Sequence, residues 1–160
     1  MALAMAMLAW CSPAMAQPSG QGGQTVSWST QPVVATRQGG RVSLVLHCAV
    51  REGWHVYALK QRENGPTPLR VALEPNDIAA AAGAPLGSAP KVEHDRAFDL
   101  DTPLYTHDFT VTVPLRLKPH VAAGRRSIPV SVRFQTCNGQ TCEPPKTLHL
   151  TAAVDVAVGG

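Results

Sequence analysis

The sequence predicts an all-β fold, a single immunoglobulin-like β-sandwich, and three observations support this prediction. Apolar residues alternate with polar ones in several segments, as they do in strands with one buried face. Fourteen prolines and thirteen glycines interrupt these segments at short intervals. No stretch sustains the 3.6-residue apolar period of an amphipathic helix. A closed β-barrel is the main alternative architecture.

Residues 1–16 are predicted to be a signal peptide. They are small and apolar, too few to span a bilayer, and they end in Ala14-Met15-Ala16, an A-x-A cleavage pattern. The basic residues that usually precede such a run are missing, since the first charged residue is Arg37. A lipoprotein site at Cys11 is disfavoured because Trp10 stands where such sites have a small residue. We therefore expect export to the periplasm.

The mature chain is expected to hold one domain. Residues 17–24 are rich in Gly, Ser and Gln and predict a flexible linker, and residues 25–156 predict the β-sandwich. No later segment has about 18 continuous apolar residues, so no membrane insertion is expected after signal cleavage. The net charge of +3 is spread thinly, which argues against nucleic acid as a partner.

The strands are predicted in the following order. Val26, Trp28 and the Val33-Val34 pair indicate an opening strand. The clearest alternation predicts further strands over residues 42–50, 109–117, 128–134 and 148–150. Ile78 to Ala82 is expected to form a helical turn, and the Ala-rich stretch from Ala79 to Ala89 is expected to be mainly loop.

Cys137 and Cys142 are the most informative residues of the chain. They flank Asn138-Gly139 and precede Pro144-Pro145, a pattern that suits a disulfide across a tight β-hairpin. A four-residue loop would set the two cysteines directly opposite each other, whereas a two-residue Asn-Gly turn would offset them. Closing so small a loop stabilises a fold by only about 2 kcal/mol on the chain-entropy model. The bond is therefore either a minor structural staple or one that opens in function.

The alternation of side chains along the strands predicts that this pair and Cys48 face different sides of their sheets. If Val132 and Phe134 face the core, Cys137 faces away from it, and the bridge is expected on an accessible face. Cys48 lies two residues after Leu46 and so points to the same side of its strand. We therefore expect it to be a small buried hydrophobe with a free thiol. No helix N-terminus or cluster of cations flanks the pair, so the sequence predicts attack by a more reactive partner thiolate.

No metal site or cofactor is predicted. The six histidines are scattered without ligand spacing, and a zinc or copper site built from His149 with the cysteines is only a weak alternative. There is no Gly-rich phosphate loop, and Gly87-Ser88-Ala89 does not match the context of a hydrolase nucleophile.

Three segments together resemble a known family. Gly53-Trp54-His55-Val56-Tyr57-Ala58, Gly65-Pro66-Thr67-Pro68-Leu69 and the run from Gln135 to Pro145 resemble the N-terminal periplasmic domain of DsbD, over about Val26 to Leu150. The resemblance implies an immunoglobulin-like sandwich that shuttles electrons by thiol–disulfide exchange, a protein-disulfide reductase without a cofactor. It implies a thioredoxin-like electron donor, which a DsbD-like membrane protein would supply. The implied acceptors are a periplasmic disulfide isomerase or a cytochrome c maturation thioredoxin.

The same resemblance assigns roles to residues. Cys142 is expected to form the mixed disulfide and Cys137 to resolve it, while Phe98 is expected to cover the bond from a cap loop. Arg96-Ala97 departs from the acidic pair that precedes this aromatic in some members. Gln135 and Tyr105 are expected to support the site. The rival hypothesis is a non-catalytic immunoglobulin-like binding module of the cell envelope or of cytochrome c assembly, with a structural disulfide.

Overall fold

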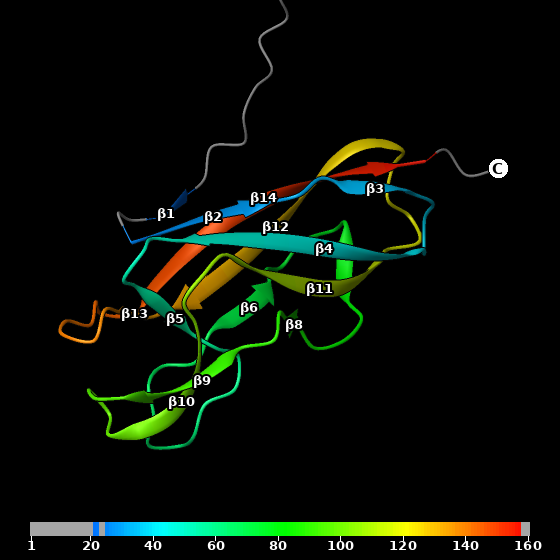
Figure 1. Ribbon diagram of the computed structural model, residues 1–160. Helices are drawn as coiled ribbons and strands as arrows, with labels where there is room; N and C mark the ends of the chain where they lie inside the picture. The colour runs from blue at the N-terminus through cyan, green and yellow to red at the C-terminus, as the bar shows by residue number, and fades with distance from the viewer. Residues whose placement is uncertain (1–20, 23–24, 158–160) are drawn as a thin grey trace, which may run out of the picture.

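The computed structural model describes residues 21–22 and 25–157, and these residues form strands and no helix (Figure 1). They therefore contain no helical segment that is long and apolar enough to cross a membrane. The strands are β1 (Gln21–Gly22), β2 (Val26–Thr30), β3 (Val33–Thr36), β4 (Arg41–Val50), β5 (His55–Tyr57), β6 (Arg70–Leu73), β7 (Ala79–Ala81), β8 (Leu86–Gly87), β9 (Lys91–Asp95), β10 (Leu100–Tyr105), β11 (Phe109–Leu117), β12 (Gly124–Phe134), β13 (Thr136–Cys137) and β14 (Lys146–Val156). The predicted all-β class is confirmed.

Two sheets enclose the main core, as expected for the immunoglobulin-like sandwich. One sheet has the order β1-β2-β4-β11-β7, with β8 also paired to β11. The other has the order β3-β14-β12-β6, in which only β3 and β14 run parallel. The long strands β4, β11, β12 and β14 lie in the regions where the alternation was strongest, because burial of every second side chain stabilises a strand along its length.

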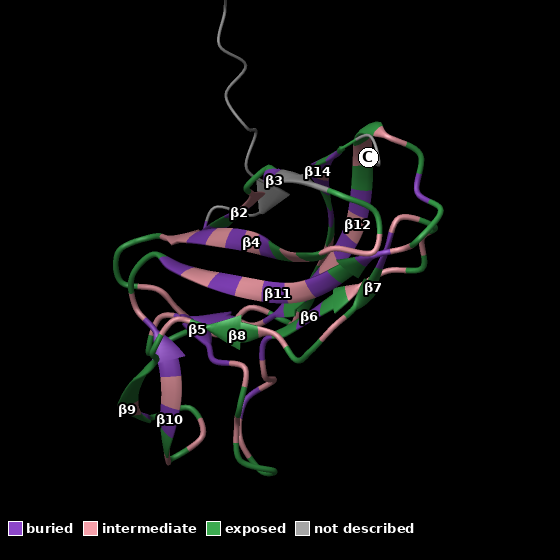
Figure 2. Ribbon diagram, turned by 90° about the vertical axis from the view of Figure 1, so that its right-hand side faces the viewer, coloured by how far each residue is buried: buried purple, intermediate pink, exposed green. Residues whose placement is uncertain are grey.

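The burial pattern follows the predicted alternation of buried and exposed side chains. Along β11 and β12 the buried side chains recur at every second residue, which Figure 2 shows as alternating bands on β11. Between the sheets, the ring of Trp28 lies 5.5 Å from that of Phe109, edge to face, and 5.8 Å from that of Phe134. This aromatic contact joins β2, β11 and β12 across the main core.

A third, smaller sheet of order β13-β5-β10-β9 lies at one end of the sandwich (Figure 1). We call it the site sheet. β9 and β10 form a hairpin, and β5 joins this hairpin to β13 through the pairs Leu104–Tyr57 and Cys137–His55. Apolar periodicity predicted none of its strands, because they have two to six residues and carry too few apolar positions to show a period.

The expectation of a helical turn at Ile78–Ala82 was wrong. Oδ1 of Asn76 accepts hydrogen bonds from the backbone N–H groups of Ile78 and Ala79, which turns the chain toward the free edge of β11. There Ala79–Ala81 pairs as β7, and Leu86–Gly87 pairs with β11 as β8. The predicted loop from Ala79 to Ala89 thus contains two short edge strands.

The start of the domain also differs from expectation. The single opening strand is two strands, because Pro32 separates β2 from β3 and the two join different sheets. Within the expected linker 17–24, Gln21 and Gly22 pair with the otherwise free edge of β2 as β1. The predicted signal peptide, residues 1–16, lies outside the described residues.

Candidate functional site

Cys137 and Cys142 form a disulfide across a hairpin, with their Cα atoms 4.1 Å apart. They pair as directly opposed antiparallel residues, and the N–H of Asn138 donates to the carbonyl of Thr141. The cysteines are therefore the close, non-hydrogen-bonded kind of pair, in which facing side chains approach most nearly. The four-residue loop is confirmed. Its tip is held by Oδ1 of Asn138, which accepts the N–H groups of Gln140 and Thr141.

The two sulfur-bearing residues differ in exposure. Cys137 is 1% exposed, whereas Cys142 is only half-buried. The expectation that the whole bridge lies on an accessible face was therefore wrong for Cys137. Parity did place it outside the main core, but side chains that share its face of the site sheet pack against it. Cys137 packs with Tyr57 and Leu104 in a second buried cluster, which we call the site cluster.

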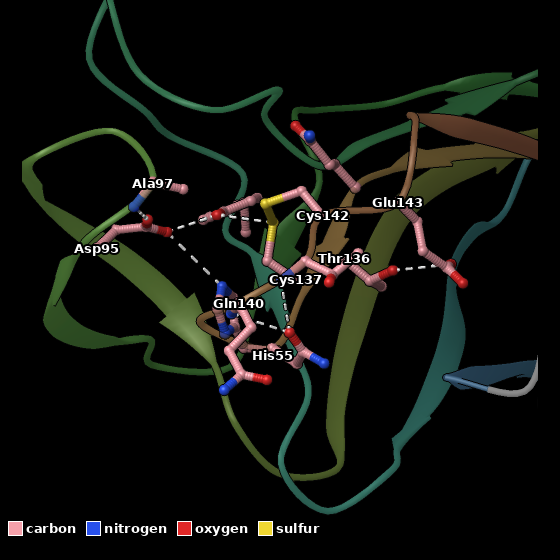
Figure 3. Close-up of a disulfide and its surroundings, with 12 residues drawn as sticks. His55, Asp95, Ala97, Thr136, Cys137, Gln140, Cys142 and Glu143 are labelled. Carbon is pink, nitrogen blue, oxygen red and sulfur yellow. Dashed lines mark hydrogen bonds and ion pairs between the residues drawn. A yellow bond between two sulfur atoms is a disulfide. The ribbon is translucent and has the colours of Figure 1, made fainter.

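Phe98 packs against the site cluster from the turn between β9 and β10. Its ring meets that of Tyr57 edge to face at 5.9 Å, and it lies with Cys142 at the rim of the cluster. The turn is fixed by Oδ1 of Asp95, which accepts the N–H of Ala97 at 2.8 Å, as Figure 3 shows. Asp99 closes it with a left-handed backbone (φ 52°). The structure thus brings Phe98 to the disulfide.

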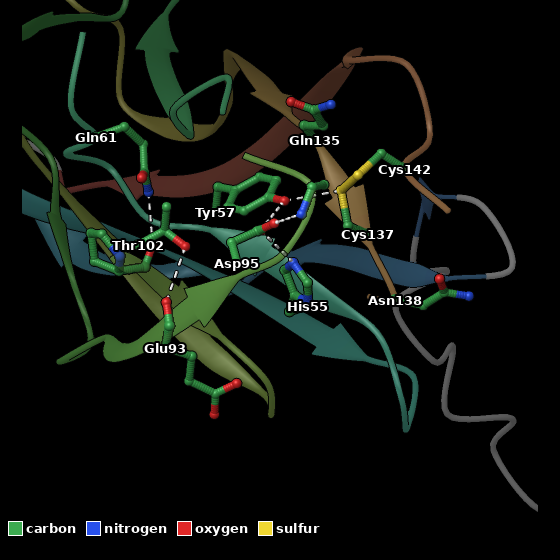
Figure 4. A network of polar contacts seen from close by, with 12 residues as sticks. His55, Tyr57, Gln61, Glu93, Asp95, Thr102, Gln135, Cys137, Asn138 and Cys142 are labelled. Carbon is green, nitrogen blue, oxygen red and sulfur yellow. Dashed lines mark hydrogen bonds and ion pairs between the residues drawn. A yellow bond between two sulfur atoms is a disulfide. The ribbon is translucent and has the colours of Figure 1, made fainter. Parts of the chain in front are cut away.

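A buried polar network touches the sulfur of Cys137 (Figure 4). The hydroxyl of Tyr57 lies 2.5 Å from Oδ2 of Asp95 and 3.1 Å from Sγ of Cys137. Burial, together with the hydrogen bond and charge of Asp95, raises the pKa of Tyr57 far above its usual value. The phenol therefore stays protonated and is held between a carboxylate and a sulfur.

His55 lies beside this network. Its Nε2 is 3.7 Å from Oδ2 of Asp95, and its ring stacks edge to face on that of Tyr57 at 5.1 Å. Burial lowers the pKa of His55, against the opposing charges of Asp95 and Glu93. The sequence analysis did not assign roles to His55, Tyr57 or Asp95. The available signal was the Gly-Trp-His-x-Tyr block, which contains two of them.

Glu143 anchors the segment that carries Cys142. Its Oε2 accepts hydrogen bonds from Lys146 at 2.9 Å, Thr136 at 3.0 Å and Thr25 at 3.2 Å. The hydrogen bond from Lys146 is the main reason that the pKa of Glu143 is lowered. The backbone N–H of Glu143 also donates to the carbonyl of Thr136. The negative charge next to Cys142 is thus largely compensated by Lys146 and the two threonines, and Figure 3 shows the contact with Thr136.

Gln135 and Tyr105 lie in different surroundings. Oε1 of Gln135 accepts the backbone N–H of Thr67, which ties the loop before β6 to the base of the disulfide hairpin. Tyr105 packs into the main core, where its ring stacks on Phe109 at 3.9 Å and its hydroxyl donates to the carbonyl of Ser88. Of the two residues expected to support the site, only Gln135 lies next to the cysteine hairpin.

A cleft of about 770 Å³ opens beside the hairpin. It runs between the loop after β4, the end of β9 and the tip of the cysteine loop. Its lining includes Trp54, His55, Glu93, Asp95, Asn138 and Gln140. The cleft brings solvent to the edge of the polar network, and Phe98 is not among its lining residues.

Cys48 and the other possible ligands lie apart from this site. Cys48 is fully buried in the main core and unpaired, as predicted. Burial, with a smaller contribution from Asp108, raises the pKa of its thiol far above the usual value. Among residues 21–22 and 25–157, no group of three or more His, Cys, Asp or Glu side chains is placed to hold a metal ion.

Comparison with known proteins gives one family. The profile described as thiol:disulfide interchange protein DsbD, N-terminal, matches residues 25–153. Among solved structures, the N-terminal periplasmic domain of ScsB from Proteus mirabilis is similar, with a TM-score of 0.55 and 14% sequence identity over 81% of this chain. The match covers 47% of the ScsB chain, so this chain spans about half the length of that neighbour.

A fimbrial subunit is a weaker match. AggA, the major subunit of aggregative adherence fimbriae type I from Escherichia coli, gives a TM-score of 0.41 and 10% identity over 82% of this chain and 94% of the subunit. A search of curated protein sequences found no match.

Proposed function

The chain belongs to the family of N-terminal domains of the thiol:disulfide interchange protein DsbD, and on this premise we propose that it passes electrons through the Cys137–Cys142 disulfide. The observation that carries the proposal is the asymmetry of the bond. Cys142 is reachable at the rim of the site cluster, while Cys137 is buried against the Tyr57 hydroxyl. A partner thiolate therefore has access to one sulfur, and the other is the natural leaving group.

The exchange proceeds in two displacements. A thiolate of a reduced, thioredoxin-like donor attacks Sγ of Cys142, the disulfide breaks, and Cys137 leaves as a thiolate. The donor's other cysteine thiolate then attacks the donor-side sulfur of the mixed disulfide. The donor's own disulfide forms, and Cys142 is released. The donor loses two electrons as it forms its own disulfide, and the Cys137–Cys142 pair gains them.

Delivery to an acceptor runs in the opposite sense. The thiolate of Cys142 attacks the acceptor's disulfide and forms a second mixed disulfide. Cys137 then attacks Sγ of Cys142, restores the intramolecular bond and frees the reduced acceptor. The short Cα separation of the hairpin supports this resolving role, because it keeps the sulfur of Cys137 beside that of Cys142.

Phe98 is proposed as the cover of the bond. It packs against Tyr57 at the rim where Cys142 lies, and it stands on a hairpin turn rather than within the sandwich. A partner that displaces this one aromatic side chain gains access to Cys142. Small thiols that do not displace it are kept out, which favours exchange with specific partners.

The proposed setting is the periplasm. Family membership supports it, because disulfides form and persist in oxidising compartments. Thioredoxin-fold proteins are the proposed donor and acceptors: a DsbD-like membrane protein as donor, and a disulfide isomerase or a cytochrome c maturation thioredoxin as acceptor. Cleavage of residues 1–16 before Gln17 is part of this proposal, and mass spectrometry of the mature N-terminus tests it.

Trapping of mixed disulfides tests the function directly. Cys137→Ser should accumulate a stable mixed disulfide through Cys142 when mixed with a thioredoxin-fold protein from the periplasm, because no resolving thiol remains. Cys142→Ser should trap little, since the remaining Cys137 is buried. Non-reducing electrophoresis followed by peptide mass spectrometry identifies the linked cysteines.

Cys48→Ala is the matched control, since Cys48 is the other cysteine of the described residues and lies in the main core. Trapping by Cys137→Ser should be unchanged in the Cys48→Ala background. Equal trapping by both hairpin variants would contradict the roles assigned to the two cysteines. Absence of trapping by either would favour a binding module with a structural disulfide.

A further inference from the structure

His55 faces Cys137 directly in the site sheet. The two residues are register partners between β5 and β13, so their side chains share one face, with Cβ atoms about 4.5–5.5 Å apart in such pairs. The Nε2 atom of His55 is buried without a hydrogen-bond partner, 3.7 Å from Oδ2 of Asp95. A polar ring nitrogen in this condition is unusual, because buried polar atoms generally find partners.

The charges around His55 come from several elements. Asp95 and Glu93 face it from β9, and Tyr57 from its own strand. The cleft that borders the ring is also lined by titratable and charged side chains of the neighbouring loops and of β9: Glu52, His94, Arg96, His107 and Asp108. Carboxylates outnumber permanent cations here, so a proton on His55 is favoured electrostatically while burial opposes it.

Opening of the disulfide changes this balance. When Cys137 leaves as a thiolate, its sulfur and the carboxylate of Asp95 both need the single proton of the Tyr57 hydroxyl, which contacts both. One O–H group cannot donate fully to two anions. A second proton near Asp95 would free the hydroxyl for the sulfur, and the nearest unpartnered polar nitrogen is Nε2 of His55.

We propose that His55 is a positioning residue for the exchange, which takes up a proton from the solvent of the cleft as the disulfide opens. The imidazolium then pairs with Asp95, and the O–H of Tyr57 turns to the sulfur of Cys137 and stabilises it as the leaving group. The electrons still come from the attacking thiolate, and His55 changes only in protonation. This inference rests on the proposed function of the cysteine pair.

The direction of the pH effect follows. In the oxidised protein burial lowers the pKa of His55, so the ring is mainly neutral at neutral pH. The thiolate of Cys137 adds a nearby negative charge, which raises that pKa in the reduced protein. Stabilisation of the leaving group is therefore largest at low pH and fades as the pH rises above the reduced-state pKa.

His55→Gln removes the titration and keeps a polar side chain, and His107→Gln in the same cleft is the matched control. The rate constant for reduction by dithiothreitol is measured for each protein between about pH 5 and pH 9. The ratio of wild type to variant cancels the ionisation of dithiothreitol. For His55→Gln this ratio should reach on the order of threefold at low pH and approach one at high pH. For His107→Gln it should stay near one throughout.

NMR titration of the wild-type imidazole provides a second readout that requires no variant to fold. The pKa of His55 should be higher in the reduced than in the oxidised protein. Equal values in both states, or a rate ratio that is independent of pH, would overturn the role of His55. Neither readout uses a protein partner, so failure of the trapping experiment would overturn the proposed function separately.

Discussion

Cys48 and Cys137 are both buried, with exposed fractions of 0% and 1%, but they lie in opposite chemical surroundings. Cys48 is packed in the main core among apolar side chains, and its sulfur makes a long hydrogen bond, 3.9 Å, to the carbonyl of the adjacent Ala49. Cys137 lies in the site cluster with a phenol at 3.1 Å, a carboxylate behind that phenol and a solvent cleft beside it.

The comparison shows that burial alone does not make a sulfur inert. In the main core, burial raises the pKa of Cys48 and nothing offsets that effect, so the thiol acts as a small hydrophobe. In the site cluster, the hydroxyl of Tyr57 is placed to stabilise charge on Cys137 as its bond to the more exposed Cys142 opens.

The rate of thiol alkylation should separate the two regions most strongly. In the reduced native protein, Cys142 should react with iodoacetamide at least about 10³ times faster than Cys48, because Cys48 is reached only when the sandwich opens. Peptide mass spectrometry over a time course measures both rates. Comparable rates would show that the main core does not protect its thiol.

Phe109→Ala should disrupt the main core and spare the site. Phe109 pairs with Cys48 across β4 and β11 and packs on Trp28, so its loss should lower the free energy of unfolding by about 3–5 kcal/mol. Urea denaturation measures this loss, and the rate of Cys48 alkylation should rise with it. A loss below about 1 kcal/mol would contradict the assigned burial.

Glu143→Gln should produce a pH-dependent loss at the site. The folded-state pKa of Glu143 is lowered, so its contribution to stability is present above the unfolded pKa and disappears as the pH falls through the folded one. The variant should be less stable than wild type by about 1–2 kcal/mol at neutral pH, with the difference vanishing in acid. Urea denaturation at both pH values is the measurement.

Glu63→Gln, at an exposed position, is the control for that comparison. It should leave the free energy of unfolding unchanged at either pH. A deficit of Glu143→Gln that persists undiminished in acid would refute the assignment of the effect to the carboxylate.

Phe98→Ala should have a smaller effect on stability than Phe109→Ala and a selective effect on access. Phe98 is half-buried on a hairpin turn, so the free energy of unfolding should fall by less than a core aromatic costs, about 3–5 kcal/mol. Reduction of the disulfide by dithiothreitol should become severalfold faster. An unchanged reduction rate beside a large fall in melting temperature would rule out the cap.

The sequence predicted the sandwich well because its long strands bury every second residue, as β11 and β12 do. The alternation also separated Cys48 from Cys137 correctly. It could not predict the site sheet, whose strands are short and whose contacts join residues far apart in the chain. Asp95 and Tyr57 meet across 38 positions, and no local pattern indicates such a contact.

The spacing and flanking residues gave the cysteine pair, and the family resemblance, through position along the chain, gave Phe98 next to it. Tyr105 illustrates the limit of that approach. It was expected to support the site, but its ring turns into the main core and stacks on Phe109, while Tyr57 from the other strand of the pair contacts Cys137. The alternation of side chains in β10 and β5 decides which tyrosine faces the sulfur.

The reduction potential of the Cys137–Cys142 bond tests the central proposal most directly. Equilibration with defined ratios of reduced and oxidised glutathione, followed by acid quenching and mass spectrometry, measures it. An exchange disulfide should give a potential above about −300 mV, within the range of thioredoxin-fold partners. A potential below about −300 mV would mark the bond as structural and contradict the proposed function.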